Sequence, residues 1–254
     1  ARWITSTHGL YNLQGEGLFL FRKQFRLNEN PERFIVHVSA DNRYRLHVNG
    51  RQVGEGPAQG TVTSWQFDTY DIAPYLVAGD NVIGSEVWQW GAKRPWTQQT
   101  HRVAFILRGD GGPESIVNTD ETWLVNQCTA LTFQTIPPDE FPFTTGVGPS
   151  EKWDLSAYPF GWKTAGASGD GFSFAAPLTQ GNPAQAARSV PEYEWRLYPR
   201  RIPFMEQKET RFAKVIRVGG NTAPRFLEGK TVPVEPNQNI RVLIDQSRIV
   251  NGYP

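Results

Sequence analysis

A tryptophan-rich stretch near the middle of the chain carries side chains of the kind that sugars bind. Saccharides present apolar C–H faces and rims of hydroxyl groups, so their sites commonly combine an indole face with amide and acid side chains. Residues 88–91 (Trp-Gln-Trp-Gly) and 94–99 (Arg-Pro-Trp-Thr-Gln-Gln) supply these groups at the end of an expected strand and in the loop after it. Trp88 ends an apolar run and is expected in the core, whereas Trp90 and Trp96 are candidates for ligand contact, with packing as the alternative.

A second candidate site is Asp41-Asn42, which lies between two expected strands. Carboxylate and amide oxygens are ligands that Ca²⁺ prefers, so these two residues would suit a calcium ion beside a sugar. Asp and Asn also hydrogen-bond to backbone groups in turns, and a plain turn explains the pair equally well. The sequence predicts no cofactor that the chain requires, and Ca²⁺ is the ion that Asp41 and Asn42 would hold.

The residue constellations of common enzymes are missing from the sequence. It contains no GxSxG, HExxH, P-loop or GxGxxG motif. The acids of residues 139–140, or Asp68 with Asp71, have the chemistry of a glycosidase acid and base, but surface acids and turn caps look the same. His37 and His47 fall inside expected strands without metal-ligand spacing, which is typical of structural histidines.

The composition argues against several kinds of partner. Lys and Arg number 26 and Asp and Glu 25 among 254 residues, and a net charge of +1 provides no basic field for nucleic acid. No apolar run approaches the roughly 18 residues that a membrane-spanning helix needs, so no membrane is expected as a partner. Cys128 is the single cysteine, which excludes a disulfide framework or a cysteine-built zinc site within the chain.

Short strand signals separated by turns predict an all-β fold. Residues 34–40 form a β-branched run, and residues 44–48 alternate apolar and polar side chains before Asn49-Gly50, a strong hairpin signal. Residues 54–57 (Gly-Glu-Gly-Pro) predict a loop, because glycine and proline interrupt a regular strand. Repeated strands of this kind indicate a jelly-roll (galactose-binding-like) β-sandwich.

The chain is expected to divide near residue 180, in a loose stretch from 166 to 191 that is dominated by Gly, Ala, Ser and Gln. Residues 1–180 would form the jelly roll, an accessory or carbohydrate-binding-like domain. Residues 181–254 would form a linker and an incomplete second β-domain. Its strand-like runs, 212–218 and 240–245, are too few to bury a core alone.

Several segments resemble a known family. Residues 39–50 (SADNRYRLHVNG) and 65–73 (WQFDTYDIA) are similar to the N-terminal jelly roll of bacterial α-L-rhamnosidase-like glycoside hydrolases of the glycoside hydrolase family 78 type. Residues 195–206 (WRLYPRRIPFME) resemble the family's link into its next β-domain, and residues 245–254 (DQSRIVNGYP) resemble a strand of that domain. Related jelly rolls occur in other glycosidases, including β-galactosidases, so the link segment is the more discriminating one.

The resemblance implies a chemistry that lies outside the chain. Members of the family carry a catalytic (α/α)₆ barrel that cleaves α-L-rhamnosides with inversion, using two carboxylates spaced to admit a water. That barrel is expected beyond Pro254, and no catalytic residue is carried over onto this sequence. The chain would brace the barrel and bind a rhamnose-containing glycan. Calcium-using rhamnose-binding modules of this fold favour Asp41 and Asn42 as the site, and the polysaccharide substrate implies an extracytoplasmic (periplasmic or secreted) location.

Three other functions fit the same residues. The chain would also suit a stand-alone carbohydrate-binding module, a purely structural domain in which every tryptophan packs, or the N-terminal part of another glycosidase or a lyase. A fold does not determine a function, so the fold alone leaves these alternatives open. Saturable binding of rhamnose or a pectic oligosaccharide separates the binding module from the structural domain.

Overall fold

The computed structural model describes residues 1–7, 9, 15–135, 148–183, 195–208, 212–219, 233, 235–238 and 241–247. Within it, the chain forms two units, Ala1–Pro203 and Phe204–Pro254.

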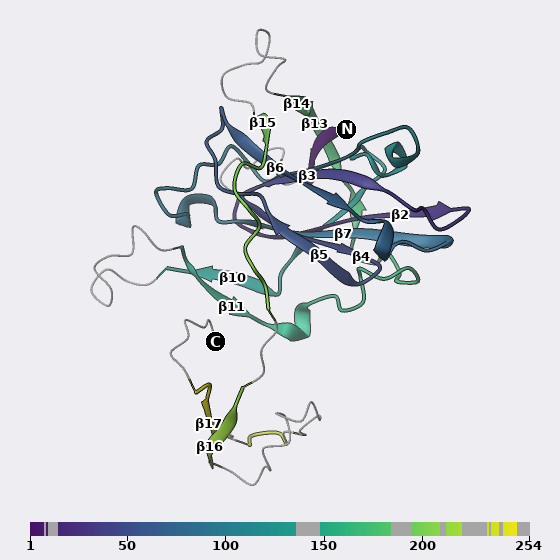
Figure 1. The fold of residues 1–254 in the computed structure, drawn as a ribbon. Helices are drawn as coiled ribbons and strands as arrows, with labels where there is room; N and C mark the ends of the chain where they lie inside the picture. Colours follow the sequence, from purple (N-terminus) through teal and green to yellow (C-terminus); the bar gives the residue numbers. More distant parts are fainter. Residues whose placement is uncertain are drawn as a thin grey trace. The chain divides into compact units, whose positions relative to one another are not determined.

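Two β-sheets build the first unit (Figure 1). In sheet order, the seven-stranded sheet consists of β13 (Ala176–Gln180), β1 (Arg2–Thr5), β8 (Ala104–Gly109), β3 (Ile35–Asp41), β6 (Trp65–Asp71), β15 (Arg196–Pro199) and β14 (Asn182–Pro183). The six-stranded sheet consists of β12 (Ser173–Phe174), β9 (Leu124–Cys128), β2 (Gly17–Leu27), β7 (Gly79–Gln89), β4 (Arg43–Val48) and β5 (Arg51–Gly56). The two sheets enclose one large hydrophobic core, so the expected all-β sandwich is confirmed.

Short elements complete this unit. They are β10 (Leu131–Gln134), β11 (Ser150–Trp153) and the 3₁₀ helices η1 (Ala73–Tyr75), η2 (Gly91–Lys93), η3 (Pro113–Val117) and η5 (Leu155–Ala157). β10 and β11 pair with each other as a separate two-stranded sheet.

Over residues 18–21, strand β2 is apolar on both faces, because both faces are buried there. Phe19 and Phe21 point into the core between the sheets, where Phe21 stacks on Phe105 of β8 with ring centroids 5.5 Å apart. Leu18 and Leu20 point the other way, into a second buried cluster. Successive side chains of a strand point to opposite faces, so the run of large apolar residues follows from burial on both sides.

The hairpin predicted at Asn49-Gly50 joins β4 to β5. Both residues have positive φ, 49° and 80°, the backbone conformation that a tight two-residue hairpin requires. Tyr44, Leu46 and Val48 of β4 all belong to the core between the sheets, as their alternation predicts.

The loop predicted over residues 54–57 is wrong, because β5 continues through Gly56. A Cβ on Gly54 would lie 2.6 Å from the Tyr70 ring, and one on Gly56 would lie 2.0 Å from Oδ2 of Asp68. The glycines are therefore present because side chains of β6 approach this backbone closely.

The first unit extends beyond the boundary that we expected near residue 180. The stretch expected to be loose contains β12, β13 and β14, and β15 pairs with β6. The contacts of the chain accordingly divide it after Pro203. Tertiary pairing of short, weakly patterned strands explains the difference, because such strands carry little signal of their own.

The second unit contains an antiparallel pair of strands, β16 (Lys214–Gly219) and β17 (Arg241–Asp245). They coincide closely with the strand-like runs of the sequence. An exposed ion pair between Lys214 and Asp245, 3.4 Å long, joins them.

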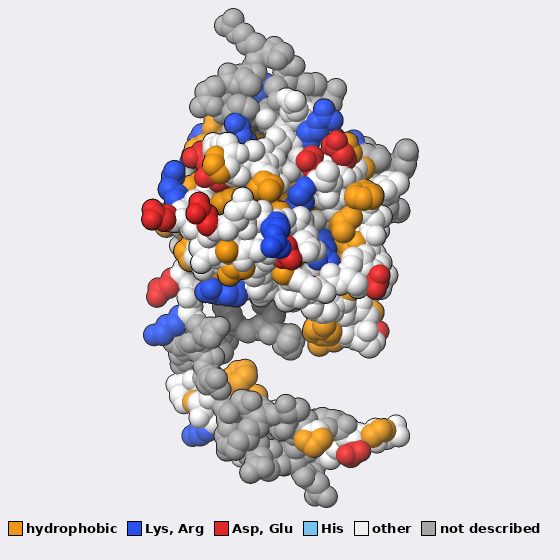
Figure 2. All heavy atoms as spheres, turned by 90° about the vertical axis from the view of Figure 1, so that its right-hand side faces the viewer, with side chains coloured by type: hydrophobic (Ala, Val, Ile, Leu, Met, Phe, Trp, Pro, Cys, Tyr) orange, Lys and Arg blue, Asp and Glu red, His pale blue; other side chains and the backbone are white. Residues whose placement is uncertain are grey.

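The surface shows no field of a single charge on the face drawn in Figure 2. There, basic and acidic side chains lie interspersed among small groups of hydrophobic ones. Among the helices that the structure describes, none has the length and apolar character needed to cross a membrane.

Candidate functional site

Asp41, predicted as a calcium ligand, is fully buried at the end of β3. Its Oδ1 accepts hydrogen bonds from Thr100 Oγ1 and Asn42 Nδ2, both at 2.6 Å. Its Oδ2 accepts from the backbone N–H of His101 at 2.7 Å and from Trp195 Nε1 at 3.1 Å. Burial raises the pKa of this carboxyl to about 6, while the hydrogen bonds act in the opposite direction.

Asn42 and Trp90 lie next to each other, as the sugar-site hypothesis requires. Asn42 is 2% exposed, and its Oδ1 accepts a 3.0 Å hydrogen bond from the backbone N–H of Trp90. The Trp90 ring is half-buried against the second hydrophobic cluster, and the Arg43 guanidinium lies 5.4 Å from its centroid. Most of these hydrogen bonds join Asp41 and Asn42 to residues distant in sequence, unlike the local bonds of a plain turn, and calcium binding there stays a prediction.

Trp96 shares no described hydrogen bond or ring contact with Asp41, Asn42 or Trp90. It is 83% exposed, and its indole makes no hydrogen bond or ring contact with any residue that the structure describes. An indole so open to solvent retains the capacity for sugar stacking that the sequence suggested.

A different group of side chains lies where the chain leaves the sandwich, along residues 195–203, here called the exit segment. Its strand β15 pairs in parallel with β6, with Leu197 opposite Trp65 and Pro199 opposite Phe67. Backbone hydrogen bonds from Arg196 N–H to Val62 O (3.0 Å) and from Arg200 N–H to Phe67 O (2.8 Å) flank the strand.

A buried tryptophan fixes the beginning of the exit segment. The Trp195 ring is 1% exposed and stacks on Trp3 of β1, with centroids 4.3 Å apart. Its indole N–H donates to Asp41, and the His101 ring meets its edge at 5.0 Å. Asp41 therefore serves as an internal anchor for a residue 154 positions away in the sequence.

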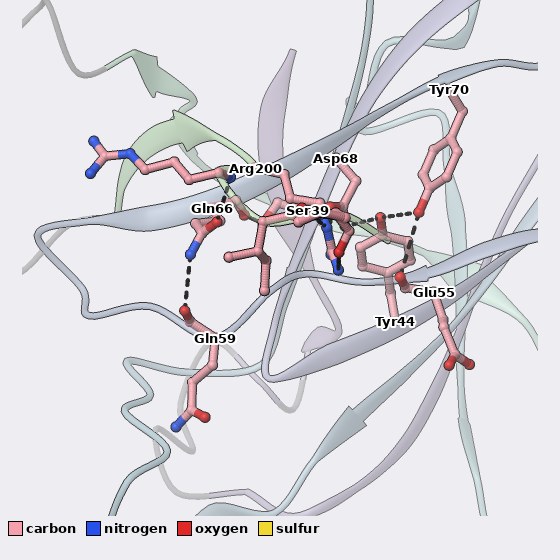
Figure 3. A network of polar contacts seen from close by, with 11 residues as sticks. Ser39, Tyr44, Glu55, Gln59, Gln66, Asp68, Tyr70 and Arg200 are labelled. Atoms are coloured by element: carbon pink, nitrogen blue, oxygen red, sulfur yellow. Dashed lines mark hydrogen bonds and ion pairs between the residues drawn. The ribbon is translucent and has the colours of Figure 1, made fainter. Parts of the chain in front are cut away.

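A buried ion pair fixes the other end of the exit segment. Arg200 Nη1 donates to Asp68 Oδ1 at 3.0 Å, while Arg200 Nε and Nη2 donate to the carbonyl oxygens of Ile202 and Pro203. Asp68 is fully buried, and its Oδ2 accepts a 2.5 Å hydrogen bond from the hydroxyl of Tyr44. Figure 3 shows this network, in which the Tyr44 hydroxyl also lies 3.1 Å from that of Tyr70.

Burial and charge act in opposite directions on Asp68. Burial raises the pKa of its carboxyl, whereas the Tyr44 hydrogen bond and the Arg200 charge lower it. Burial also raises the pKa of Tyr44 well above its usual range, with the adjacent Asp68 charge acting in the same direction, which keeps the phenol protonated as a donor.

The other residues considered from the sequence have local partners. Asp71 accepts hydrogen bonds from the N–H groups of Phe34 (3.0 Å) and of Ala73 (3.1 Å), the first residue of η1, and makes no described hydrogen bond with Asp68. His47 is buried, with Nε2 3.2 Å from Lys163 Nζ, and burial lowers the pKa of its imidazole to about 4. The acids of residues 139–140 lie outside the described residues.

Comparison with known proteins shows the family. A sequence model described as the α-L-rhamnosidase N-terminal domain matches residues 29–192. The chain belongs to this family. Among curated proteins, no sequence matches the chain.

Solved structures show the same fold. The GH78 family rhamnosidase of Bacillus sp. GL1 has a TM-score of 0.71 at 22% identity and matches 89% of this chain. An α-L-rhamnosidase from Aspergillus terreus has 0.58 at 18% identity over 87% of the chain, and one from Dictyoglumus thermophilum has 0.56 at 17% over 78%. The matches cover 22%, 24% and 22% of those three chains, so this chain spans about a quarter or less of their length.

Proposed function

We propose that the chain is the N-terminal accessory region of an inverting α-L-rhamnosidase-like glycoside hydrolase acting on rhamnose-containing glycans. Membership of the N-terminal domain family supports this placement. The whole enzyme would carry its two catalytic carboxylates on an (α/α)₆ domain beyond Pro254, with a water between them for inversion. An extracytoplasmic location, where such glycans are met, belongs to the same proposal.

The observation that carries the bracing role is the double anchoring of the exit segment. Trp195 is held by Asp41 and Arg200 by Asp68, and both carboxylates are fully buried. A segment held at both ends leaves the sandwich in one direction, so whatever follows it starts from a fixed point. Such a fixed start reduces the conformational freedom of the connection to the catalytic domain.

The second role in the proposal is glycan binding near the catalytic domain. A linked binding site raises the effective concentration of a polymeric substrate without adding any chemistry. The open indole of Trp96 supports this role.

Hydrolysis of an aryl α-L-rhamnoside tests the proposal. The 254-residue chain is expected to release no aryl alcohol, whereas the complete protein releases it and forms the sugar first as the inverted anomer, seen by NMR. Turnover by the 254-residue chain alone would overturn the accessory role. A complete protein inactive on rhamnosides but active on another glycoside would replace the substrate class.

A further inference from the structure

A pocket with a cavity volume of about 400 Å³ opens on the first unit. Side chains from five strands line it: His37 (β3), Phe67 (β6), Ile106 and Arg108 (β8), Gln180 (β13) and Leu197 (β15). These residues lie on the outer face of the seven-stranded sheet, because the alternate residues of β3 and β8 belong to the core between the sheets. The volume is within the range typical of small-molecule sites.

The apolar part of the lining has a shape and chemistry that suit a sugar face. Phe67 is half-buried. Its ring and the ring of His37 make a T-shaped contact, with centroids 5.4 Å apart. Ile106 and Leu197 belong to the hydrophobic cluster on this outer face. An aromatic ring flanked by aliphatic groups accepts the apolar C–H face of a saccharide.

The charged groups of the pocket are unequally paired. Asp110 also lines the pocket. Its Oδ1 lies 3.1 Å from His37 Nε2, and its Oδ2 lies 3.8 Å from Arg33 Nη2. Nδ1 of His37 is 2.9 Å from Thr69 Oγ1, so both ring nitrogens have partners. The Arg108 guanidinium, by contrast, makes no hydrogen bond or ion pair with any residue in the described part of the chain. Among the described side chains that line the pocket, Arg108 is thus the cation without an ion-pair partner, next to a carboxylate that pairs with Arg33 and hydrogen-bonds to His37; the terminus of Ala1 lines the pocket as well.

We propose that this pocket binds an acidic sugar unit, a uronate, with its C–H face on Phe67 and its carboxylate on Arg108. A guanidinium presents a planar fork of donors that matches a carboxylate in two parallel hydrogen bonds. The amide of Gln180 at the rim can both donate to and accept from ring hydroxyls. The inference rests on the proposed glycan-binding role and gives that role a site on the outer face of the seven-stranded sheet, whose lining does not include Trp96.

A matched pair of ligands isolates the carboxylate contact. D-Galacturonate and D-galactose differ only in the group on C6, and both can be titrated into the 254-residue chain by calorimetry or ligand-detected NMR. We expect galacturonate to bind at least about tenfold more tightly than galactose, and its affinity to fall as salt screens the charges. Arg108→Gln should abolish this difference, and Phe67→Leu should weaken both ligands.

One variant serves as the control. Arg26→Gln removes another exposed arginine and should leave galacturonate affinity unchanged. Because Arg108 is exposed, its variant should keep the wild-type tryptophan fluorescence and circular dichroism, which verifies folding. Equal galacturonate binding by Arg108→Gln and wild type overturns the pocket assignment. If rhamnose or an oligosaccharide binds and only Trp96→Ala loses it, the pocket fails and glycan binding stands. If no saccharide binds at all, the glycan-binding role fails with it.

Discussion

Breaking the Arg200–Asp68 pair should destabilise the first unit far more than breaking a surface pair of the same length. In both Arg200–Asp68 and Arg26–Asp80, an arginine Nη1 lies 3.0 Å from an aspartate Oδ1. The side chains of the first pair are 12% and 0% exposed, and those of the second are 71% and 55% exposed. The two pairs therefore share this distance but differ in burial, and Asp68 and Arg200 are also hydrogen-bonded to Tyr44 and to two backbone carbonyl oxygens.

The expected magnitudes follow from that difference. Arg200→Ala leaves a buried carboxylate without its cation, which costs about 3 kcal/mol of the free energy of unfolding near neutral pH. Asp68→Asn keeps an acceptor for Tyr44 but loses the charge, which costs about 2 kcal/mol. Either change in the exposed pair, Arg26→Ala or Asp80→Asn, should cost less than about 0.5 kcal/mol. At acidic pH, Asp68 of the Arg200→Ala variant becomes protonated and no longer carries an unpaired buried charge. The loss in the free energy of unfolding of this variant should therefore be smaller at acidic pH than near neutral pH.

Urea unfolding followed by tryptophan fluorescence measures these differences. All nine tryptophans lie before residue 204, so the signal reports on the first unit alone. The double variant of Arg200 and Asp68 should lose less than the sum of the single losses, because each single change already breaks the pair. A loss for Arg200→Ala as small as that for Arg26→Ala, or strict additivity in the double variant, would refute this account of the anchor.

Three further predictions concern packing and pH. Gly54→Ala should lower the free energy of unfolding by about 2 kcal/mol or more, because the new Cβ would lie 2.6 Å from the Tyr70 ring. Gly112→Ala has open space around its Cβ and should be nearly neutral in the same denaturation assay. The depressed pKa of His47, about 4 against 6.5, gives a stability contribution that is complete above pH 6.5 and is lost as pH falls towards 4. The total is about 3 kcal/mol, and His47→Gln should remove this acid loss in urea titrations across that range. The raised pKa of Asp41, about 6 against 3.8, acts oppositely: its contribution is complete below pH 3.8 and is lost by about pH 6, so Asp41→Asn should flatten stability over that interval.

The sequence predicted the parts of the fold that local patterns determine. The β4–β5 hairpin followed from Asn49-Gly50, whose backbone conformation few other residues adopt easily. The continuation of β5 through Gly54 could not be predicted, because the reason for the glycine is a side chain of another strand. Glycine read locally indicates a break, whereas here it permits a close approach.

The candidate sites were harder to predict because they depend on contacts distant in sequence. Asp68 and Arg200 are 132 positions apart, and no local spacing connects them. The similarity of residues 195–206 to a family link did indicate that this segment matters, without showing its anchors. His37 and Arg108 line one pocket because β3 and β8 are neighbours in the sheet. The order of strands in a sheet cannot be predicted from the sequence of any single strand.

Amide hydrogen exchange along the exit segment tests the bracing claim most directly. In the wild type, the amides of Arg196 and Arg200, bonded to Val62 O and Phe67 O, should exchange slowly, as should β2. Asp68→Asn should speed exchange in residues 195–203 about tenfold or more, β2 should speed up by no more than the loss in the free energy of unfolding accounts for, and Asp80→Asn should change neither. Rapid exchange of the exit segment in the wild type, or equal exchange in the two variants, would contradict the claim that buried carboxylates fix the path of the chain.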